Sequence, residues 1–182
     1  MTCVVGIALN GKIYMGADSC SSDVSEKYGR KDAKVFESHD MLLGYSGSWR
    51  FGNLFRFKFD PPAQRSDKED FEFLVTDWVD ALRTVCKSEG YTKIEDNEES
   101  FDGSALIGYK GKLYVLEGDW NIGEPNMDYA AIGSGSAVAL GALYASVKAS
   151  KSMTPKARIE AALEAASEYA VGVAPPFVFL SK

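Results

Sequence analysis

The sequence has very little histidine and cysteine, and both shortages limit the chemistry that one chain can perform. His39 is the only histidine, so zinc sites built from several histidines and mechanisms that need two histidines are excluded within one chain. This histidine lies in the polar segment 37–40, which we expect to be a turn between two strands. If the protein is an enzyme, its general base is therefore expected to be a group other than imidazole.

The three cysteines, Cys3, Cys20 and Cys86, show no CxxC spacing. An odd number without that spacing argues against a disulfide framework and against a zinc ribbon. Reduced thiols are typical of the cytoplasm, so the sequence predicts a cytoplasmic protein.

Long apolar runs, an excess of positive charge and a calcium-binding pattern are also missing. No run reaches the roughly 18 apolar residues that span a bilayer, and residues 1–6 lack the layout of a signal peptide. The net charge is −6, whereas nucleic-acid binding needs a clustered basic surface. The acidic stretch 95–102 lacks the Asp-x-Asp-x-Asp-Gly order of a calcium loop and is predicted to be a surface loop. We expect no membrane, nucleic-acid or metal partner.

What is present is an ordinary globular composition. The chain has 182 residues, of which 46% are hydrophobic and 25% are charged. This length favours one domain, covering residues 1–182, with a sizeable core.

Apolar segments separated by tight-turn residues predict β-hairpins. Asn10-Gly11 is the strongest of these turn signals, because both residues tolerate the positive φ of a type I′ turn. Three hairpins and one single strand are predicted, over residues 2–17, 34–45, 104–116 and 177–180.

Apolar residues repeating every three to four positions predict helices over 71–85, 138–147 and 154–170. Thr154-Pro155 starts the last of them with an N-cap and a proline at the first helical position. The aromatic run 49–59 is predicted to be a further helix, which either packs in the core or faces a neighbouring subunit.

The order of these elements predicts the fold class. Hairpins joined by tight turns form antiparallel sheets. Helices grouped between sets of hairpins suit two sheets packed face to face with helices outside. The predicted fold is therefore α+β, a four-layer αββα sandwich.

Thr2 directly follows Met1, and threonine is small enough for removal of the methionine to be expected. Removal would leave an α-amine beside a hydroxyl on one residue, and such a pair can act as general base and nucleophile. The ordinary pKa of an α-amine is about 7.7–8.0, so a modest lowering leaves it largely neutral at working pH. With Met1 attached, the nitrogen is an amide and this base does not exist.

Five short segments carry a further pattern: Thr2-Cys-Val-Val-Gly-Ile7, Met15-Gly-Ala-Asp18, Ala33-Lys-Val-Phe36, Gly44-Tyr-Ser-Gly47 and Gly133-Ser-Gly135. In this combination and order, the chain resembles the proteasome β-subunit family and the related HslV peptidases. Asp18 and Lys34 stand sixteen and thirty-two residues after Thr2, as the family's aspartate and lysine do after its catalytic threonine. The matches spread from residue 2 to about 147, and their combination is specific although no single segment is.

The resemblance implies a role for five residues. Thr2 Oγ is the implied nucleophile and its freed amine the general base, while Lys34 lowers the pKa of the amine and Asp18 keeps Lys34 charged and oriented. The backbone N–H of Gly44 is the implied oxyanion donor, and Ser134 hydrogen-bonds near the amine. A preorganised oxyanion donor typically lowers the barrier by about 3–4 kcal/mol.

Taken singly, these residues have simpler interpretations. Lys34 could be a surface lysine and Asp18 could cap the loop 19–23, but their joint spacing from Thr2 favours a catalytic arrangement. The Gly133-Ser-Gly135 segment is not a dinucleotide-binding loop, because Val138 stands where glycine or alanine is required. No cofactor is expected.

The chain departs from the family in its last long helix. Proteasome subunits usually bring an aspartate and a serine from this helix to the active site. The corresponding positions are Ala170 and Val173, whose side chains cannot replace a carboxylate and a hydroxyl.

The sequence therefore predicts a threonine-type peptide hydrolase with Thr2 as nucleophile after removal of Met1. By resemblance it would be one subunit of a homo-oligomeric ring that degrades unfolded polypeptide supplied by an ATPase unfoldase. Two alternatives stay open. One is a catalytically silent subunit of the same fold used for assembly, of cellular or viral origin. The other is an N-terminal nucleophile amidase acting on a small amide.

Overall fold

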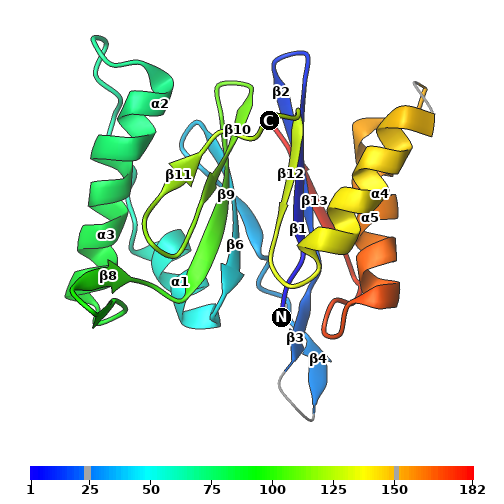
Figure 1. The fold of residues 1–182 in the computed structure, drawn as a ribbon, viewed down its shortest axis with the longest axis horizontal. Coiled ribbons are helices and arrows are strands. Elements are labelled where there is room, and N and C mark those ends of the chain that lie inside the picture. Colours follow the sequence, from blue (N-terminus) through cyan, green and yellow to red (C-terminus); the bar gives the residue numbers. More distant parts are fainter. Residues whose placement is uncertain (23–25, 150–151) are drawn as a thin grey trace.

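Two antiparallel sheets packed face to face form the centre of the molecule, and helices cover both outer surfaces (Figure 1). The computed structural model describes residues 1–22, 26–149 and 152–182. The order of layers is helices, sheet, sheet, helices, so the predicted α+β sandwich of four layers is confirmed.

The strands and helices have the following bounds. The four-stranded sheet contains β1 (Val4–Leu9), β2 (Lys12–Ala17), β12 (Tyr129–Ile132) and β13 (Val178–Ser181). The five-stranded sheet contains β5 (Val35–Ser38), β6 (Met41–Gly47), β9 (Gly103–Tyr109), β10 (Lys112–Leu116) and β11 (Ile122–Gly123). Two small hairpins pair β3 (Cys20–Ser22) with β4 (Lys27–Gly29) and β7 (Lys93–Glu95) with β8 (Glu98–Ser100). The helices are α1 (Trp49–Phe57), α2 (Asp70–Phe73), the π-helix η1 (Leu74–Trp78), α3 (Val79–Ser88), α4 (Ser136–Ala149) and α5 (Pro155–Tyr169).

Strand order places the two chain ends in one sheet. The four-stranded sheet runs β12-β1-β2-β13 and the five-stranded sheet runs β11-β10-β9-β6-β5. β1 is therefore a central strand, with β12 on one side and β2 on the other. This pairing brings residues that are far apart in the sequence beside the start of the chain.

The predicted turns and caps form for the expected reasons. Asn10 and Gly11 have φ values of 52° and 75°, as a type I′ turn requires. His39 has a φ of 53° in the turn between β5 and β6, so the turn predicted for segment 37–40 is confirmed. The Thr154 hydroxyl accepts a hydrogen bond from the Ala157 N–H at 3.2 Å and caps α5.

Three apolar clusters fill the spaces between the layers. Phe51, Phe55 and Phe59 lie fully inside the cluster between the first helical layer and the five-stranded sheet. Phe57, in contrast, is 72% exposed. The core interpretation of the aromatic run is thus correct for these three rings; Trp49 is partly buried against the same cluster, and Phe57 faces outward.

Two of the sequence predictions need correction. The acidic stretch 95–102, predicted to be a surface loop, contains part of the β7–β8 hairpin, which turns at Asp96 and Asn97 with positive φ. The loop predicted over 19–23 is instead the start of β3 at Cys20, and residue 23 lies outside the described residues. No helix in the described part of the chain is long and apolar enough to cross a bilayer.

Candidate active site

Thr2 lies immediately before β1, at the end of the sandwich where the chain begins (Figure 1). Antiparallel pairing sets Val4 opposite Ile132, so the residues after β12 run beside Thr2. The segment Gly133-Ser-Gly135 therefore reaches Thr2 because of strand register, not because of sequence proximity.

Ser134 and its two glycine neighbours hold the Thr2 backbone. The Thr2 N–H donates to Ser134 Oγ at 3.1 Å, and the Ser134 hydroxyl lies 3.3 Å from the Thr2 carbonyl oxygen. The Gly135 N–H donates to the same carbonyl at 3.1 Å. Gly133 has a φ of +91°, and a Cβ there would lie 2.4 Å from the Thr2 oxygen. Only glycine permits so close an approach, which explains this residue type.

Asp18 and Lys34 form a buried ion pair. Lys34 Nζ lies 2.9 and 3.0 Å from the two carboxylate oxygens, and the side chains are 2% and 0% exposed. The carboxylate also accepts the N–H groups of Cys3, at 2.8 Å, and Cys20, at 2.9 Å. The salt bridge expected from the spacing is present, and the alternative of a surface lysine is wrong.

The three protons of Lys34 have identifiable acceptors. Besides Asp18, Nζ donates to the Cys20 carbonyl at 2.7 Å and to the Met1 carbonyl at 3.3 Å. The Thr2 hydroxyl donates to that same Met1 oxygen at 2.7 Å. Burial lowers the pKa of Lys34 below its ordinary 10.5, although the nearby Asp18 charge acts in the opposite direction. A cation and a hydroxyl thus converge on one peptide carbonyl.

Met1 covers the candidate nucleophile. Thr2 is only 3% exposed, whereas Met1 is 44% exposed. A Cβ on Gly172 would lie 2.8 Å from both Met1 Cβ and Met1 Cε, so the methionine side chain rests on the turn after α5. Removal of Met1 would uncover the hydroxyl and leave the new amine beside Ser134 Oγ.

Gly44 lies in the middle of β6 and has a packing role. The N–H of Tyr45 donates to the Lys34 carbonyl at 3.0 Å, so the N–H of Gly44 points the other way, toward Leu106 of β9. A Cβ on Gly44 would lie 2.6 Å from Val4 Cγ1, so the glycine lets the two sheets approach. An N–H inside a sheet ladder is not a free donor, and this geometry does not favour the oxyanion role predicted for Gly44.

The turn at the end of β6 was missed as a functional element. Gly47 has a φ of +106°, and Ser48 follows it as the N-cap of α1. The Ser48 N–H has no protein acceptor among the residues that the structure describes. A Cβ on Gly133 would lie 2.9 Å from Ser46 Oγ, which puts this strand end beside the Thr2 carbonyl. The second glycine of Gly44-Tyr-Ser-Gly47 was the signal that could have found the turn.

Val173, one of the two positions where the chain departs from the family, lies beside the segment that holds Thr2. Ala170 ends α5, and Val173 is buried. A Cβ on Gly135 would lie 3.0 Å from Val173 Cγ2. This side of the candidate site is therefore apolar.

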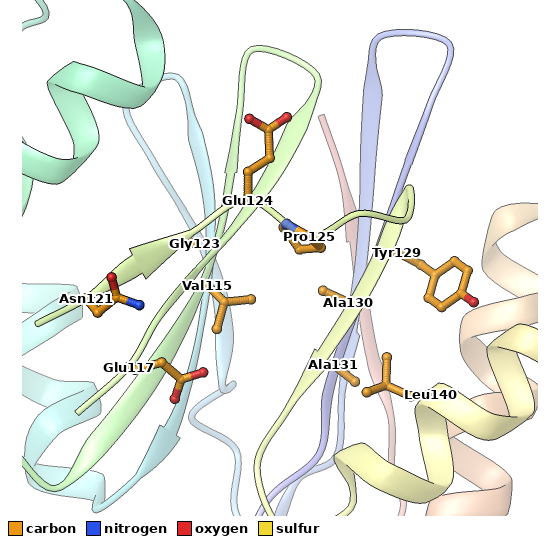
Figure 2. A pocket seen from close by; sticks show the side chains of 10 residues that line it. All are labelled: Val115, Glu117, Asn121, Gly123, Glu124, Pro125, Tyr129, Ala130, Ala131 and Leu140. Atoms are coloured by element: carbon orange, nitrogen blue, oxygen red, sulfur yellow. The ribbon is translucent and has the colours of Figure 1, made fainter. Parts of the chain in front are cut away.

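A separate pocket of about 320 Å³ lies between the edges of the two sheets, lined by β10, β11, β12 and Leu140 of α4 (Figure 2). Glu117 and Glu124 are the carboxylates in its lining. None of the five residues predicted for the active site is in that lining. Over the described ranges, no group of three or more His, Cys, Asp or Glu residues could hold a metal ion.

Solved structures with this architecture match the whole chain. BPH from Thiobacillus denitrificans, solved in complex with epoxomicin, has a TM-score of 0.81 and 22% identity, covering 100% of this chain and 98% of that one. Eukaryotic HslV from Trypanosoma brucei has a TM-score of 0.71 and 14% identity, covering 99% and 98%. Anbu from Yersinia bercovieri, described as an ancestral β-subunit, has a TM-score of 0.66 and 14% identity, covering 99% and 81%.

No family model and no curated protein matches the chain. At these levels of identity, the structural matches establish the fold. The chain has the fold of the proteasome β-subunits and HslV-type N-terminal nucleophile hydrolases, as the sequence resemblance implied.

Proposed function

We propose that this chain, once Met1 is removed, is a threonine-type peptide hydrolase. The observation that carries the proposal is the convergence of Thr2 Oγ and Lys34 Nζ on one carbonyl oxygen, with Ser134 Oγ at the Thr2 nitrogen. The Met1 carbonyl is an analogue of a substrate carbonyl, since it is a peptide C=O in contact with both the hydroxyl and the cation.

In the proposed reaction, Thr2 Oγ attacks the substrate carbonyl carbon while the Thr2 amine takes the hydroxyl proton. The tetrahedral oxyanion is stabilised by N–H groups of the Gly47–Ser48 turn. The amine then protonates the departing amine of the substrate, and an ester to Thr2 remains, which water hydrolyses. Lys34 lowers the pKa of the Thr2 amine because two nearby cations repel. Asp18 holds Lys34 in place.

By the same resemblance, the proposed protease is a homo-oligomeric ring supplied with polypeptide by an ATPase unfoldase. Light scattering or native mass spectrometry should then show a multimer. A clean monomer at micromolar concentration would count against the ring.

A second candidate function has a specific observation in its favour. Ala170 and Val173 leave the site without the carboxylate and hydroxyl that proteasome subunits usually bring from the last long helix. A silent subunit with this fold, used for assembly, would tolerate that loss.

The two candidates differ in their reaction with a peptide epoxyketone such as epoxomicin, the compound bound in the BPH structure. The ketone takes the threonine hydroxyl and the epoxide takes the amine, so the adduct needs both groups on one residue. Protein that starts at Thr2, as checked by intact mass, should gain the mass of one inhibitor. Thr2→Ala and a chain that keeps Met1 should gain none, whereas Thr2→Ser should still react. If Met1-free protein does not react, the silent subunit is the correct reading.

A further inference from the structure

A chain of hydrogen bonds ties the start of α1 to the loop before β9. Ser48 Oγ and Tyr91 Oη are 2.6 Å apart, and Tyr91 Oη is 2.7 Å from the Asp102 carbonyl oxygen. Ser48 Oγ also accepts the Phe51 N–H at 3.2 Å as the cap of α1. Tyr91 comes from the segment after α3, where its own N–H donates to the Cys86 carbonyl at 2.7 Å. Three separate segments are therefore joined through one hydroxyl.

The direction of each hydrogen bond follows from counting protons. The Asp102 carbonyl can only accept, so Tyr91 donates its single proton to it. Tyr91 must then accept from Ser48, which spends its own proton on this bond. The remaining lone pairs of Ser48 Oγ are free to accept the Phe51 N–H. Only this arrangement satisfies the Asp102 carbonyl, the two hydroxyls and the Phe51 N–H together. The Tyr91 hydroxyl therefore fixes the Ser48 side chain.

The loop that anchors Tyr91 also confines the preceding residue. A Cβ on Gly47 would lie 2.6 Å from the Asp102 carbonyl oxygen and 2.7 Å from the Gly103 Cα. The Gly47–Ser48 turn is thus held by backbone contact on one side and by the Tyr91 hydroxyl on the other.

Packing contacts lead from this turn to the backbone of Thr2. It directly follows Ser46, whose Oγ is close to Gly133, and Gly133 packs against the Thr2 carbonyl. The candidate oxyanion donors are therefore one residue from contacts that reach Thr2, while Tyr91 acts on them from outside the site.

We propose that Tyr91 is a positioning residue for the oxyanion-binding turn Gly47–Ser48. Its hydroxyl holds Ser48 so that the N–H groups of the turn face the carbonyl oxygen of a substrate bound at Thr2. The inference rests on the proposed hydrolase function, and Tyr91 itself contacts no substrate in this scheme.

The expected effect falls on the transition state. The negative oxygen forms only when the hydroxyl has attacked, so a displaced oxyanion donor weakens transition-state binding more than substrate binding. Loss of the Tyr91 hydroxyl should therefore lower kcat about tenfold to a hundredfold and leave KM nearly unchanged.

Tyr91→Phe is a clean variant because the ring has its own contacts. It stacks on Phe51 with ring centroids 6.0 Å apart, which the variant retains. Tyr109→Phe is the matched control: its hydroxyl donates to Gln64 Oε1 at 2.7 Å, at the other end of β9. Both variants lose one phenolic hydrogen bond, but only one of these bonds leads to the Gly47–Ser48 turn.

Met1-free wild type and both variants should be compared by hydrolysis of a fluorogenic peptide amide and by affinity for a peptide boronate. The tetrahedral boronate adduct places an oxygen where the oxyanion forms. We expect Tyr91→Phe to lose kcat and boronate affinity in parallel, with thermal unfolding shifted no more than in Tyr109→Phe. In a Ser48→Ala background, Tyr91→Phe should add little further loss, because the hydroxyl would act through Ser48.

The outcomes separate this inference from the function on which it rests. A wild type that neither hydrolyses the peptide nor binds the boronate overturns both. An active wild type with an equally active Tyr91→Phe overturns the role of Tyr91 alone. A loss of equal size in Tyr91→Phe and Tyr109→Phe, in step with unfolding, would also overturn it.

Discussion

The buried pair of Asp18 and Lys34 makes a quantitative prediction about how the site is held together. Lys34→Met removes the ammonium but keeps an unbranched side chain of similar length. Among the described residues, the Asp18 carboxylate, which is 0% exposed, then keeps only the N–H groups of Cys3 and Cys20 as partners. Breaking a buried ion pair costs about 3–5 kcal/mol, and the two remaining donors place this variant near the lower value, about 3 kcal/mol.

The opposite single variant should be worse. Asp18→Leu leaves the buried Lys34 ammonium with the Met1 and Cys20 carbonyls as its partners in the described part of the chain, and it also removes the acceptor of two buried N–H groups. Each orphaned donor costs about 1–3 kcal/mol, so the total loss is expected to exceed about 5 kcal/mol. Urea unfolding at pH 7 measures both losses. A chain that keeps Met1 is the right background, because Thr2 then has no free amine and catalysis does not interfere.

Two results would refute this reasoning. A loss below about 1 kcal/mol for Lys34→Met is typical of a solvated pair and would mean that water reaches the site. A larger loss for Lys34→Met than for Asp18→Leu would mean that the N–H groups of Cys3 and Cys20 do not depend on the carboxylate. Because the pair is buried, any rate measured for a Lys34 variant requires a check that the variant is folded.

Three further predictions concern the charge of Lys34, the buried thiols of Cys3 and Cys86, and the hydroxyl of Ser134. Burial lowers the pKa of Lys34 below its ordinary 10.5, so as the pH rises the ammonium loses its charge before pH 10.5 is reached. The rate of epoxyketone labelling should fall over that range, because neutral Lys34 no longer supplies positive charge at the carbonyl under attack; an alkaline fall in rate that begins only at or above pH 10.5 would contradict this. Burial raises the pKa of Cys3 to about 12 and that of Cys86 to about 11. A thiol reagent at pH 8 should therefore modify them only after unfolding, and a mass shift in native protein would contradict the burial. Ser134→Ala removes the partner of the Thr2 nitrogen and should slow labelling about tenfold while costing about 1 kcal/mol of stability; an unchanged labelling rate would remove Ser134 from the proposed mechanism.

The elements that could be predicted from sequence have strong local signals. Asn10-Gly11 specifies a turn by its φ preferences, and Thr154-Pro155 specifies a helix start by its cap. The proximity of Asp18 and Lys34 was predictable for another reason, namely a spacing shared with a known family. In each case, the signal is contained in a few residues or in fixed offsets from Thr2.

The elements that sequence reasoning missed have no distinctive pattern in their own residues. β12 is four residues long and pairs with β1, more than a hundred residues earlier in the chain. The β3–β4 hairpin is short and polar, so it has no apolar alternation to reveal it. Within the helix predicted over 71–85, the π-helix η1 changes the turn without altering the apolar repeat.

The two glycines of Gly44-Tyr-Ser-Gly47 show the same limit of sequence reasoning. Their roles differ because of their places in the sheet register, which the sequence does not reveal. Gly44→Ala would place a Cβ 2.6 Å from Val4 Cγ1, and overpacking of this kind typically costs about 1–3 kcal/mol. Gly47→Ala meets backbone at 2.6 Å with a φ of +106°, so the turn itself must move.

We therefore expect the two variants to fail in different ways. Gly44→Ala should lose stability but, where folded, should react with a peptide epoxyketone at nearly the wild-type rate. Gly47→Ala should lose reactivity at temperatures where circular dichroism shows it to be folded, because the oxyanion donors are displaced. Labelling rates of both Met1-free variants, each measured well below its own unfolding transition, provide the comparison. A slower reaction in folded Gly44→Ala than in folded Gly47→Ala would return the oxyanion role to Gly44, and with it the reading that the sequence first suggested.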